Sequence, residues 1–255
     1  MCLQLNASHQ QVIDAINNFN AGYHEDFRST RSIAKKYLED DGVKHSNELA
    51  ASLERSLINF GAGQRQAPKV RKVKQVAEFL GCEENHQCFA VLNKCGSMLY
   101  ESGCPVADFG KHLLSIINAT SREILDGATN VTYPTKALML VTGFMPALDS
   151  QVRSGLSKTG LRGFGGTTFR MPEGNGSLEA RKLIALPIIL GEFYRKNSET
   201  LKAAAATAER KYRYLEDEPG RLLDVMLFMQ GNAGGEANPM IQCDRAQFAD
   251  WYARN

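Results

Sequence analysis

The sequence predicts an all-α fold, a two-lobed helical bundle in which residues 1–255 form a single helical unit. Apolar residues recur at intervals of three and four along most of the chain, as on the buried face of a helix. The alternation of apolar and polar residues that marks a strand is scarce. Glycines follow two of the helical patterns, at Gly61 and Gly127, and glycine commonly ends a helix.

Ten segments carry the helical pattern. In chain order they cover about residues 12–19, 46–58, 72–80, 88–100, 106–125, 134–141, 149–156, 178–196, 199–214 and 221–230. Ser46 has a side chain suited to capping the second segment. Pro187 removes one backbone donor from the segment 178–196 and should kink it.

Other parts of the chain complete this organisation. A short hairpin fits residues 160–170, and residues 231–239 are expected to form a loop. An approximate boundary near residue 110 separates an N-terminal helical lobe, 1–110, from a lobe with the C-terminal helices, 111–255.

The charge of the chain is nearly balanced, but it is unevenly distributed. A net charge of +2 creates no overall field that would draw the protein to a polyanion. Five cations with no acid among them nevertheless lie close together: Arg65, Lys69, Arg71, Lys72 and Lys74. Such a run can contact phosphates and make binding salt-dependent, or it can be a solvated helix face.

Composition also bears on location and cofactors. No apolar run reaches the ~20 residues of a membrane-spanning helix, and the first residues lack the basic-then-apolar order of a signal peptide. We therefore expect a cytoplasmic protein with no membrane contact, in which the six cysteines are free thiols. Four of them lie with His86 between Cys82 and Cys104, but none form a C-x-x-C pair, so we expect no metal and no cofactor.

Residues 134–153 carry the strongest indication of chemistry. An apolar helix opens near Lys136 and ends at Gly143, and Asp149 follows at the start of the next helix. This arrangement aims an amine and a carboxylate at one place, although they lie thirteen residues apart in the chain. The alternative is that Asp149 only caps its helix and that Lys136 is a surface lysine.

The segment 126–152 resembles the helix-hairpin-helix DNA glycosylases, in particular the divergent relatives of 8-oxoguanine glycosylase. Lys136, between a threonine and an alanine, resembles the family's lysine step. The string from Met145 to Val152 resembles its P-x-D-x-x-V step, with one extra residue between the proline and Asp149.

The neighbouring segments complete the resemblance, with departures. Residues 112–125 and the turn at Gly127 fit the family's first helix and hairpin. The glycine-rich hairpin is replaced by residues 129–134, which contain no glycine. The interval from lysine to aspartate is shorter than in the better-known enzymes, and the four-cysteine iron–sulfur loop of some relatives is absent.

The resemblance implies an enzyme, a DNA glycosylase that acts as a monomer in base excision. It would flip a damaged or modified base out of double-stranded DNA and hydrolyse its N-glycosidic bond. Asp149 would stabilise the oxocarbenium-like transition state by its charge. Lys136 would either attack the sugar C1′ as a Schiff-base nucleophile, giving AP lyase activity, or stay charged and hold a phosphate or the flipped base. Its backbone amide would offer a phosphate contact at a helix start.

Several further residues are expected to contact the DNA. They are Tyr133, Thr135, Arg153, Arg162, Arg170, Arg65, Lys69, Arg71 and Lys72. Phe164, Tyr133 and Phe144 either stack on an extruded base or belong to the core.

Two other functions fit the same sequence. The altered hairpin favours a non-catalytic helical DNA-binding protein, and the nearly neutral charge favours a helical protein-interaction module. For the substrate, the resemblance to divergent family members favours a modified base in foreign DNA, such as phage DNA, and hence a role in phage defence.

Overall fold

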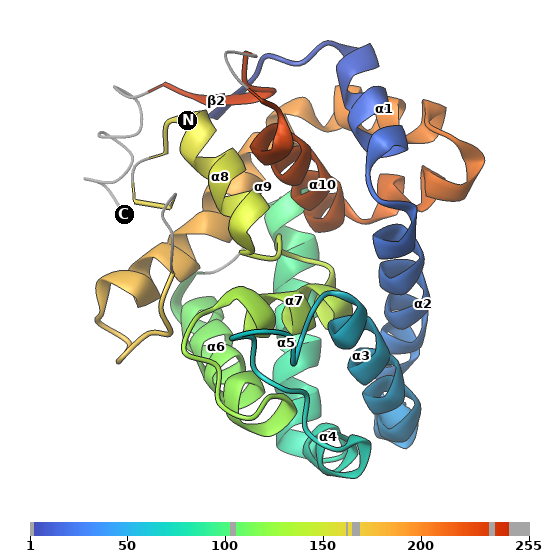
Figure 1. The fold of residues 1–255 in the computed structure, drawn as a ribbon, viewed down its shortest axis with the longest axis vertical. Helices are drawn as coiled ribbons and strands as arrows, with labels where there is room; N and C mark the ends of the chain where they lie inside the picture. The colour runs from blue at the N-terminus through green and yellow to red at the C-terminus, as the bar shows by residue number, and fades with distance from the viewer. Residues whose placement is uncertain (1–2, 103–105, 162, 165–168, 235–237, 245–255) are drawn as a thin grey trace.

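A computed structural model of the chain describes residues 3–102, 106–161, 163–164, 169–234 and 238–244. Helices make up most of this part, and the one sheet within it is a pair of three-residue strands (Figure 1). The predicted all-α class is therefore confirmed.

The elements follow one another in a simple order. The helices are α1 (His9–Asn18), α2 (Ala21–Tyr37), α3 (Ser46–Asn59), α4 (Val73–Leu80), α5 (Glu83–Glu101), α6 (Val106–Ala119), α7 (Thr132–Thr142), α8 (Ser150–Thr159), α9 (Leu178–Thr207) and α10 (Pro219–Asn232). Three shorter turns are the 3₁₀ segments η1 (Gly42–His45) and η3 (Arg210–Asp217) and the π turn η2 (Thr120–Ile124). The strands are β1 (Leu3–Leu5) and β2 (Ile241–Cys243).

Helix α2 is absent from the predicted helices, and its composition explains why. Its buried face comprises His24, Thr30 and Arg31 besides Phe27, Ala34 and Tyr37. These positions are spaced as on a helix, but half of them are polar or charged, so the apolar periodicity is weak. The hydroxyl of Thr30 is paired with those of Ser52 and Ser56 at 2.8 Å each, which shows how this polar face is satisfied.

Helix α9 corrects one expectation. It runs without a break through the predicted gap near residue 197 and ends at Thr207, and Pro187 lies inside it. The polar residues at that gap bond back to the helix itself, Asn197 to the carbonyl oxygen of Phe193 at 2.8 Å and Ser198 to that of Arg195 at 3.2 Å. Both polar side chains thus have partners within the continuous helix.

One local expectation was also wrong. Ser46 does not cap α3, because it is the first helical residue and His45 occupies the cap position without a side-chain bond. The short hairpin expected at residues 160–170 falls partly on residues that are not described, and Arg170, at its end, forms a bridge with Asn130. Residues 162 and 165–168 lie outside the described residues.

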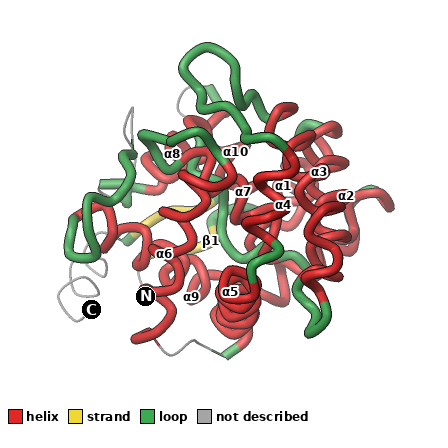
Figure 2. The backbone as a smooth tube through the Cα atoms, turned by 90° about the horizontal axis from the view of Figure 1, so that it is seen from below, coloured by secondary structure: helices red, strands yellow, loops and turns green. Residues whose placement is uncertain are grey.

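The two ends of the described chain lie side by side. Strands β1 and β2 are antiparallel, with Leu3 opposite Cys243 and Leu5 opposite Ile241. Helix α1 packs on α9 and α10, while α2 to α7 gather in the other half of the molecule (Figures 1 and 2). A division at residue 110 therefore separates β1 and α1 from the elements on which they pack.

Helices α8 and α10 approach closely because glycines face the contact. A Cβ on Gly155 would lie 1.9 Å from the carbonyl oxygen of Leu227, and one on Gly231 would lie 2.0 Å from that of Gln151. Only glycine permits this separation. The close approach places α10 beside the start of α8, where Asp149 lies.

A buried ion pair joins the two halves of the molecule. The Nε atom of Arg31, on α2, lies 3.1 Å from a carboxylate oxygen of Glu218, the residue before α10. Arg31 also donates to the carbonyl oxygen of Val141 at 2.5 Å and to Asn93 at 3.0 Å. Lys35 reaches the same carboxylate at 2.7 Å from a largely exposed position.

We expect Glu218→Gln to lower the free energy of unfolding by about 3–5 kcal/mol, because it leaves the charge of Arg31 buried without its counterion. Urea denaturation measures this. Glu25→Gln is the matched control, since Glu25 pairs with Arg28 on the surface, and such a pair contributes at most about 1 kcal/mol. Equal losses in the two variants would contradict a structural role for the buried pair.

Candidate active site

Lys136 and Asp149 meet, as their positions in the sequence predict. Lys136 lies one turn into α7, which ends at Gly143 in the left-handed conformation with φ +69°. The chain then returns to Asp149 at the start of α8. The Nζ atom of Lys136 and the Oδ2 atom of Asp149 are 3.8 Å apart.

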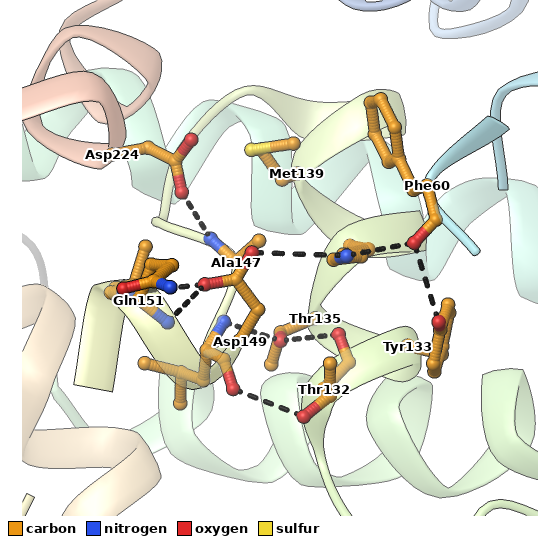
Figure 3. Close-up of polar contacts among 12 residues, drawn as sticks. Phe60, Thr132, Tyr133, Thr135, Met139, Ala147, Asp149, Gln151 and Asp224 are labelled. Atoms are coloured by element: carbon orange, nitrogen blue, oxygen red, sulfur yellow. Dashed lines mark hydrogen bonds and ion pairs between the residues drawn. The ribbon is translucent and has the colours of Figure 1, made fainter. Parts of the chain in front are cut away.

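The two oxygens of Asp149 have different surroundings. Oδ1 accepts hydrogen bonds from the backbone N–H groups of Gln151 at 3.0 Å and Val152 at 2.9 Å, so Asp149 is the N-cap of α8 (Figure 3). Oδ2 is the oxygen that faces Lys136. The cap and the pairing with the amine are thus made by one carboxylate, and the helix fixes its orientation.

The segment that carries Asp149 is held from two helices. Thr135 of α7 accepts the N–H of Leu148 at 2.9 Å, and Thr132 donates to the carbonyl oxygen of Leu148 at 3.1 Å (Figure 3). From α10, Asp224 accepts the N–H of Ala147 at 2.9 Å. These bonds fix the backbone immediately before Asp149.

The amine of Lys136 is largely withdrawn from solvent, with its side chain 11% exposed. Nζ donates to the carbonyl oxygen of Phe60 at 3.2 Å and lies 5.4 Å and 5.1 Å from the ring centroids of Phe60 and Tyr133. Burial lowers the pKa of the amine below its ordinary value, although the carboxylates of Asp149 and Asp224 act in the opposite direction. A lowered pKa increases the fraction of neutral, nucleophilic amine at a given pH.

A small cavity adjoins this pair. It has about 20 Å³ of internal space, which is enough for about one water molecule. Its walls are mostly aromatic or charged, and they comprise Phe19, Tyr23, Phe60, Lys136, Met139, Ala147, Asp149, Arg221, Asp224 and Phe228. A carboxylate and an amine at the edge of a small, largely aromatic cavity interact more strongly with a developing charge than they would in water.

Arg221 and Asp224 also line this cavity, although they are not among the residues that the sequence pattern predicted to act there. Both are buried on α10 and are bonded to each other one turn apart. The Arg221 guanidinium also donates to the carbonyl oxygen of Tyr23 at 3.1 Å and lies over the rings of Phe19 and Phe27. Two charged residues in an otherwise apolar helix were the signal that could have identified them.

Burial, together with the nearby charge of Asp149, raises the pKa of the Asp224 carboxyl to about 6, against the attraction of Arg221. The cavity therefore holds two carboxyl groups, one of which, Asp224, is withdrawn from solvent and bonded to Ala147. Asp224 thus positions the segment before Asp149.

Two of the residues predicted to contact DNA are buried, and a third is half-buried. Thr135 is buried and bonded to Leu148. Arg153 is buried as well, and its Nε donates to the carbonyl oxygen of Asp149 at 3.3 Å. The hydroxyl of Tyr133 donates to the carbonyl oxygen of Phe60 at 3.3 Å, although its half-buried ring lies beside Lys136. Sequence spacing alone did not distinguish these inward-facing side chains from exposed ones.

Phe144 and Phe164 are both buried, and Phe144 packs edge-on against Phe109, so for these two residues the alternative of a place in the core is confirmed. The expectation for the amide donor was wrong. The backbone amide of Lys136 is not at a free helix start, because α7 begins at Thr132 and the N–H of Thr135 is already bonded to the carbonyl oxygen of Val131.

The predicted cations elsewhere are mostly exposed. Lys69 and Lys72 lie on the surface, and so does Arg65, whose φ is +52°. Arg71 is half-buried, and Arg170 is exposed beside Asn130. Arg162 lies outside the described residues.

The described residues contain no group of three or more His, Cys, Asp or Glu side chains arranged to hold a metal ion. Cys82 is exposed, Cys88 and Cys95 are partly buried, and Cys104 lies outside the described part of the chain. Within the described residues, no helix combines the length and the apolar character that a membrane span requires.

Comparison of the whole chain with protein-family models, with curated proteins and with solved structures found no match.

Proposed function

We propose that this protein is a DNA glycosylase, which flips a damaged or modified base out of double-stranded DNA and cleaves its N-glycosidic bond. The observation that carries the proposal is the pairing of Lys136 and Asp149 at 3.8 Å, at the edge of a largely buried cavity. An amine with a lowered pKa beside an oriented carboxylate suits chemistry at a carbon that develops positive charge.

In this proposal Asp149 stabilises the transition state. As the bond from C1′ to the base nitrogen lengthens, positive charge develops on C1′ and the ring oxygen of the sugar. Oδ2 faces the cavity edge while Oδ1 stays bonded to the start of α8. The carboxylate therefore does not need to reorient during the reaction, which is what makes such a charge effective.

Lys136 provides the nucleophile in the bifunctional form of this reaction. The lone pair of neutral Nζ forms a bond to C1′ as the base departs with the electrons of the glycosidic bond and takes up a proton. Opening of the sugar ring then gives a protonated Schiff base, from which β-elimination breaks the strand. Oδ2 of Asp149 is placed to accept the proton that the amine must lose. If Lys136 stays charged, water attacks instead and Asp149 acts alone.

The cavity must open before a base can enter. Its space of about 20 Å³ accommodates a water molecule but not a nucleobase. Tyr23 and Phe228 are half-buried aromatic residues of the wall, and we expect their side chains to move aside. Movement of side chains and loops on binding is common in proteins that order their site around a ligand.

The small volume of the cavity favours a second candidate function, a non-catalytic helical DNA-binding protein. In that case the pairing of Lys136 with Asp149 only stabilises the fold, with Asp149 as the helix cap. The two candidates differ in one product, the abasic site.

A panel of duplexes separates them. The purified protein is incubated with unmodified, damaged and enzymatically modified DNA, including phage DNAs with different base modifications, and alkali-labile sites are then counted. We expect abasic sites in at least one modified substrate and none in unmodified DNA. Salt-sensitive DNA binding without any abasic product would favour the second candidate, and no binding at low salt would contradict both.

The proposal extends to the setting of the reaction. A modified base in foreign DNA, as in phage DNA, is the proposed substrate class, and a monomer in the cytoplasm is the proposed form. The free thiols of Cys82, Cys88 and Cys95 suit a reducing compartment.

A further inference from the structure

A second cleft, separate from the aromatic cavity, lies between α6, the π turn η2 and residues 171–175. It has a volume of about 510 Å³. Its lining residues are Lys111, Ser115, Asn118, Ser121, Arg122, Ala128, Met171 and Asn175. Two of them are cations, four carry hydroxyl or amide groups, and none is a carboxylate. Such a lining is complementary to an anion with several acceptor oxygens.

Part of the lining of the cleft can be seen in the sequence as a stripe of polar residues at helical spacing. Lys111, Ser115, Asn118 and Arg122 follow one another at intervals of four, three and four, which places them on one face of a helix. The opposite face of α6 is apolar and includes the buried residues Leu113, Ile116 and Ile117. The stripe is thus the solvent-facing side of a core helix, and it ends at the turn that leads to α7.

Several backbone donors of that turn are already used. The N–H of Gly127 is bonded to the carbonyl oxygen of Ser121 at 3.1 Å, and the N–H of Ala128 is bonded to the hydroxyl of Ser121 at 2.9 Å. The N–H of Val131 is bonded to the carbonyl oxygen of Phe169 at 3.0 Å. These three groups are not available to an anion, and the side chains of the stripe supply donors in their place.

The basic run adjoins the same turn from the other side. Arg71 donates through Nε to the carbonyl oxygens of Arg122 at 2.5 Å and Leu125 at 3.0 Å. Val70 forms a bridge with Leu125, and the N–H of Lys69 is bonded to the carboxylate of Asp126 at 2.8 Å. The cations of the run and those of the cleft thus form one basic surface around residues 121–128.

Acidic residues border this surface without lining the cleft. Glu123 and Glu173 are exposed on adjoining segments, and Asp126 is bonded to the backbone of Lys69.

The cleft itself is also close in the chain to the candidate active site. Helix α7 begins at Thr132, directly after this turn, and carries Lys136 one turn later.

We propose that this cleft binds a backbone phosphate of the DNA, held by Lys111 and Arg122. The inference rests on the proposed action on DNA and adds where the strand is gripped. Each phosphate contact releases a counterion, so the cleft should contribute to the salt dependence of binding. A strand bound here runs past the start of α7 toward Lys136 and Asp149.

The test is the affinity of the double variant Lys111→Gln/Arg122→Gln for an unmodified duplex, measured by fluorescence anisotropy from about 50 to 200 mM salt. We expect the affinity at low salt to fall roughly tenfold per lost cation, and the slope of log K against log salt to fall by about one to two. Both side chains are exposed, so the melting temperature should be unchanged. Lys111→Glu/Arg122→Glu should weaken binding further.

The control is Lys36→Gln/Arg28→Gln, which removes the same charge from exposed positions on α2. Helix α2 lies across the molecule from α6 (Figures 1 and 2). Equal effects in the two double variants would overturn the proposal, because they would reflect net charge alone. Wild-type affinity and slope in the cleft variant would also overturn it, even if abasic sites are produced as proposed above.

A separate arm uses inorganic phosphate, with thermal stability as the readout. Stabilisation of the wild type but not of the cleft variant, combined with unchanged DNA binding, would assign the cleft to a free phosphate and overturn the DNA assignment. Loss of DNA binding in the cleft variant would support the proposal whether or not any base is released.

Discussion

Asp149→Asn is expected to reduce base release by about 10²–10⁴-fold while DNA binding stays close to that of the wild type. The substitution removes the charge that faces the reaction centre at Oδ2. It preserves the cap of α8, because asparagine retains an acceptor oxygen for the N–H groups of Gln151 and Val152. The measurement is single-turnover release of the base from the best substrate of the panel.

Two controls make this result specific. Asp149→Ala should lose the same activity and in addition about 1 kcal/mol of stability, because it removes the cap. Asp40→Asn changes an exposed acid outside both the cavity and the cleft, and it should leave base release at the wild-type rate. Base release by Asp149→Asn at the wild-type rate would show that the carboxylate serves only as a helix cap.

Lys136→Gln is expected to abolish the covalent protein–DNA adduct that borohydride traps from a Schiff base. Glutamine can still donate a hydrogen bond toward the carbonyl oxygen of Phe60, the contact that Nζ makes at 3.2 Å. Lys136→Arg keeps the charge but cannot form the adduct, so it separates the loss of the nucleophile from the loss of the cation. The readout is the retarded band on a denaturing gel.

The pH dependence of trapping gives a further check on the same residue. The nucleophile is the neutral amine, so trapping should increase with pH and reach half its maximum at the pKa of Lys136. Burial lowers that pKa, so the midpoint should lie below the ordinary lysine value of 10.5. No adduct with any cleaved substrate would leave Asp149 and water as the catalytic groups.

The pairing of Lys136 with Asp149 could be predicted from the sequence because both residues lie in one short segment of the chain. A helix that opens near Lys136, ends at Gly143 and is followed by a capped helix at Asp149 restricts where both side chains can lie. The position of Arg221 and Asp224 at the cavity could not be predicted in this way. They reach the cavity from α10, more than seventy residues along the chain from Asp149, through the glycine contact of α8 with α10.

The DNA-contact predictions show the same limit. Thr135 and Arg153 lie close to the pair in the sequence, but the structure turns both inward to hold the backbone before and at Asp149. Conversely, Lys111 and Arg122 were not predicted, although their spacing was visible. Only the packing of residues 171–175 against α6 and η2 makes a cleft of that stripe.

The sequence by itself determined the helical class, most of the helices and the meeting of Lys136 with Asp149. These depend on periodicity, capping and short-range geometry, which act within a few turns of chain. The tertiary structure alone decided the burial that lowers the pKa of Lys136, the polar face of α2 and the cavity walls from α2, α10 and the residues that end α1 and α3. The physical reason is that desolvation depends on which distant segments cover a residue, and no local pattern specifies them.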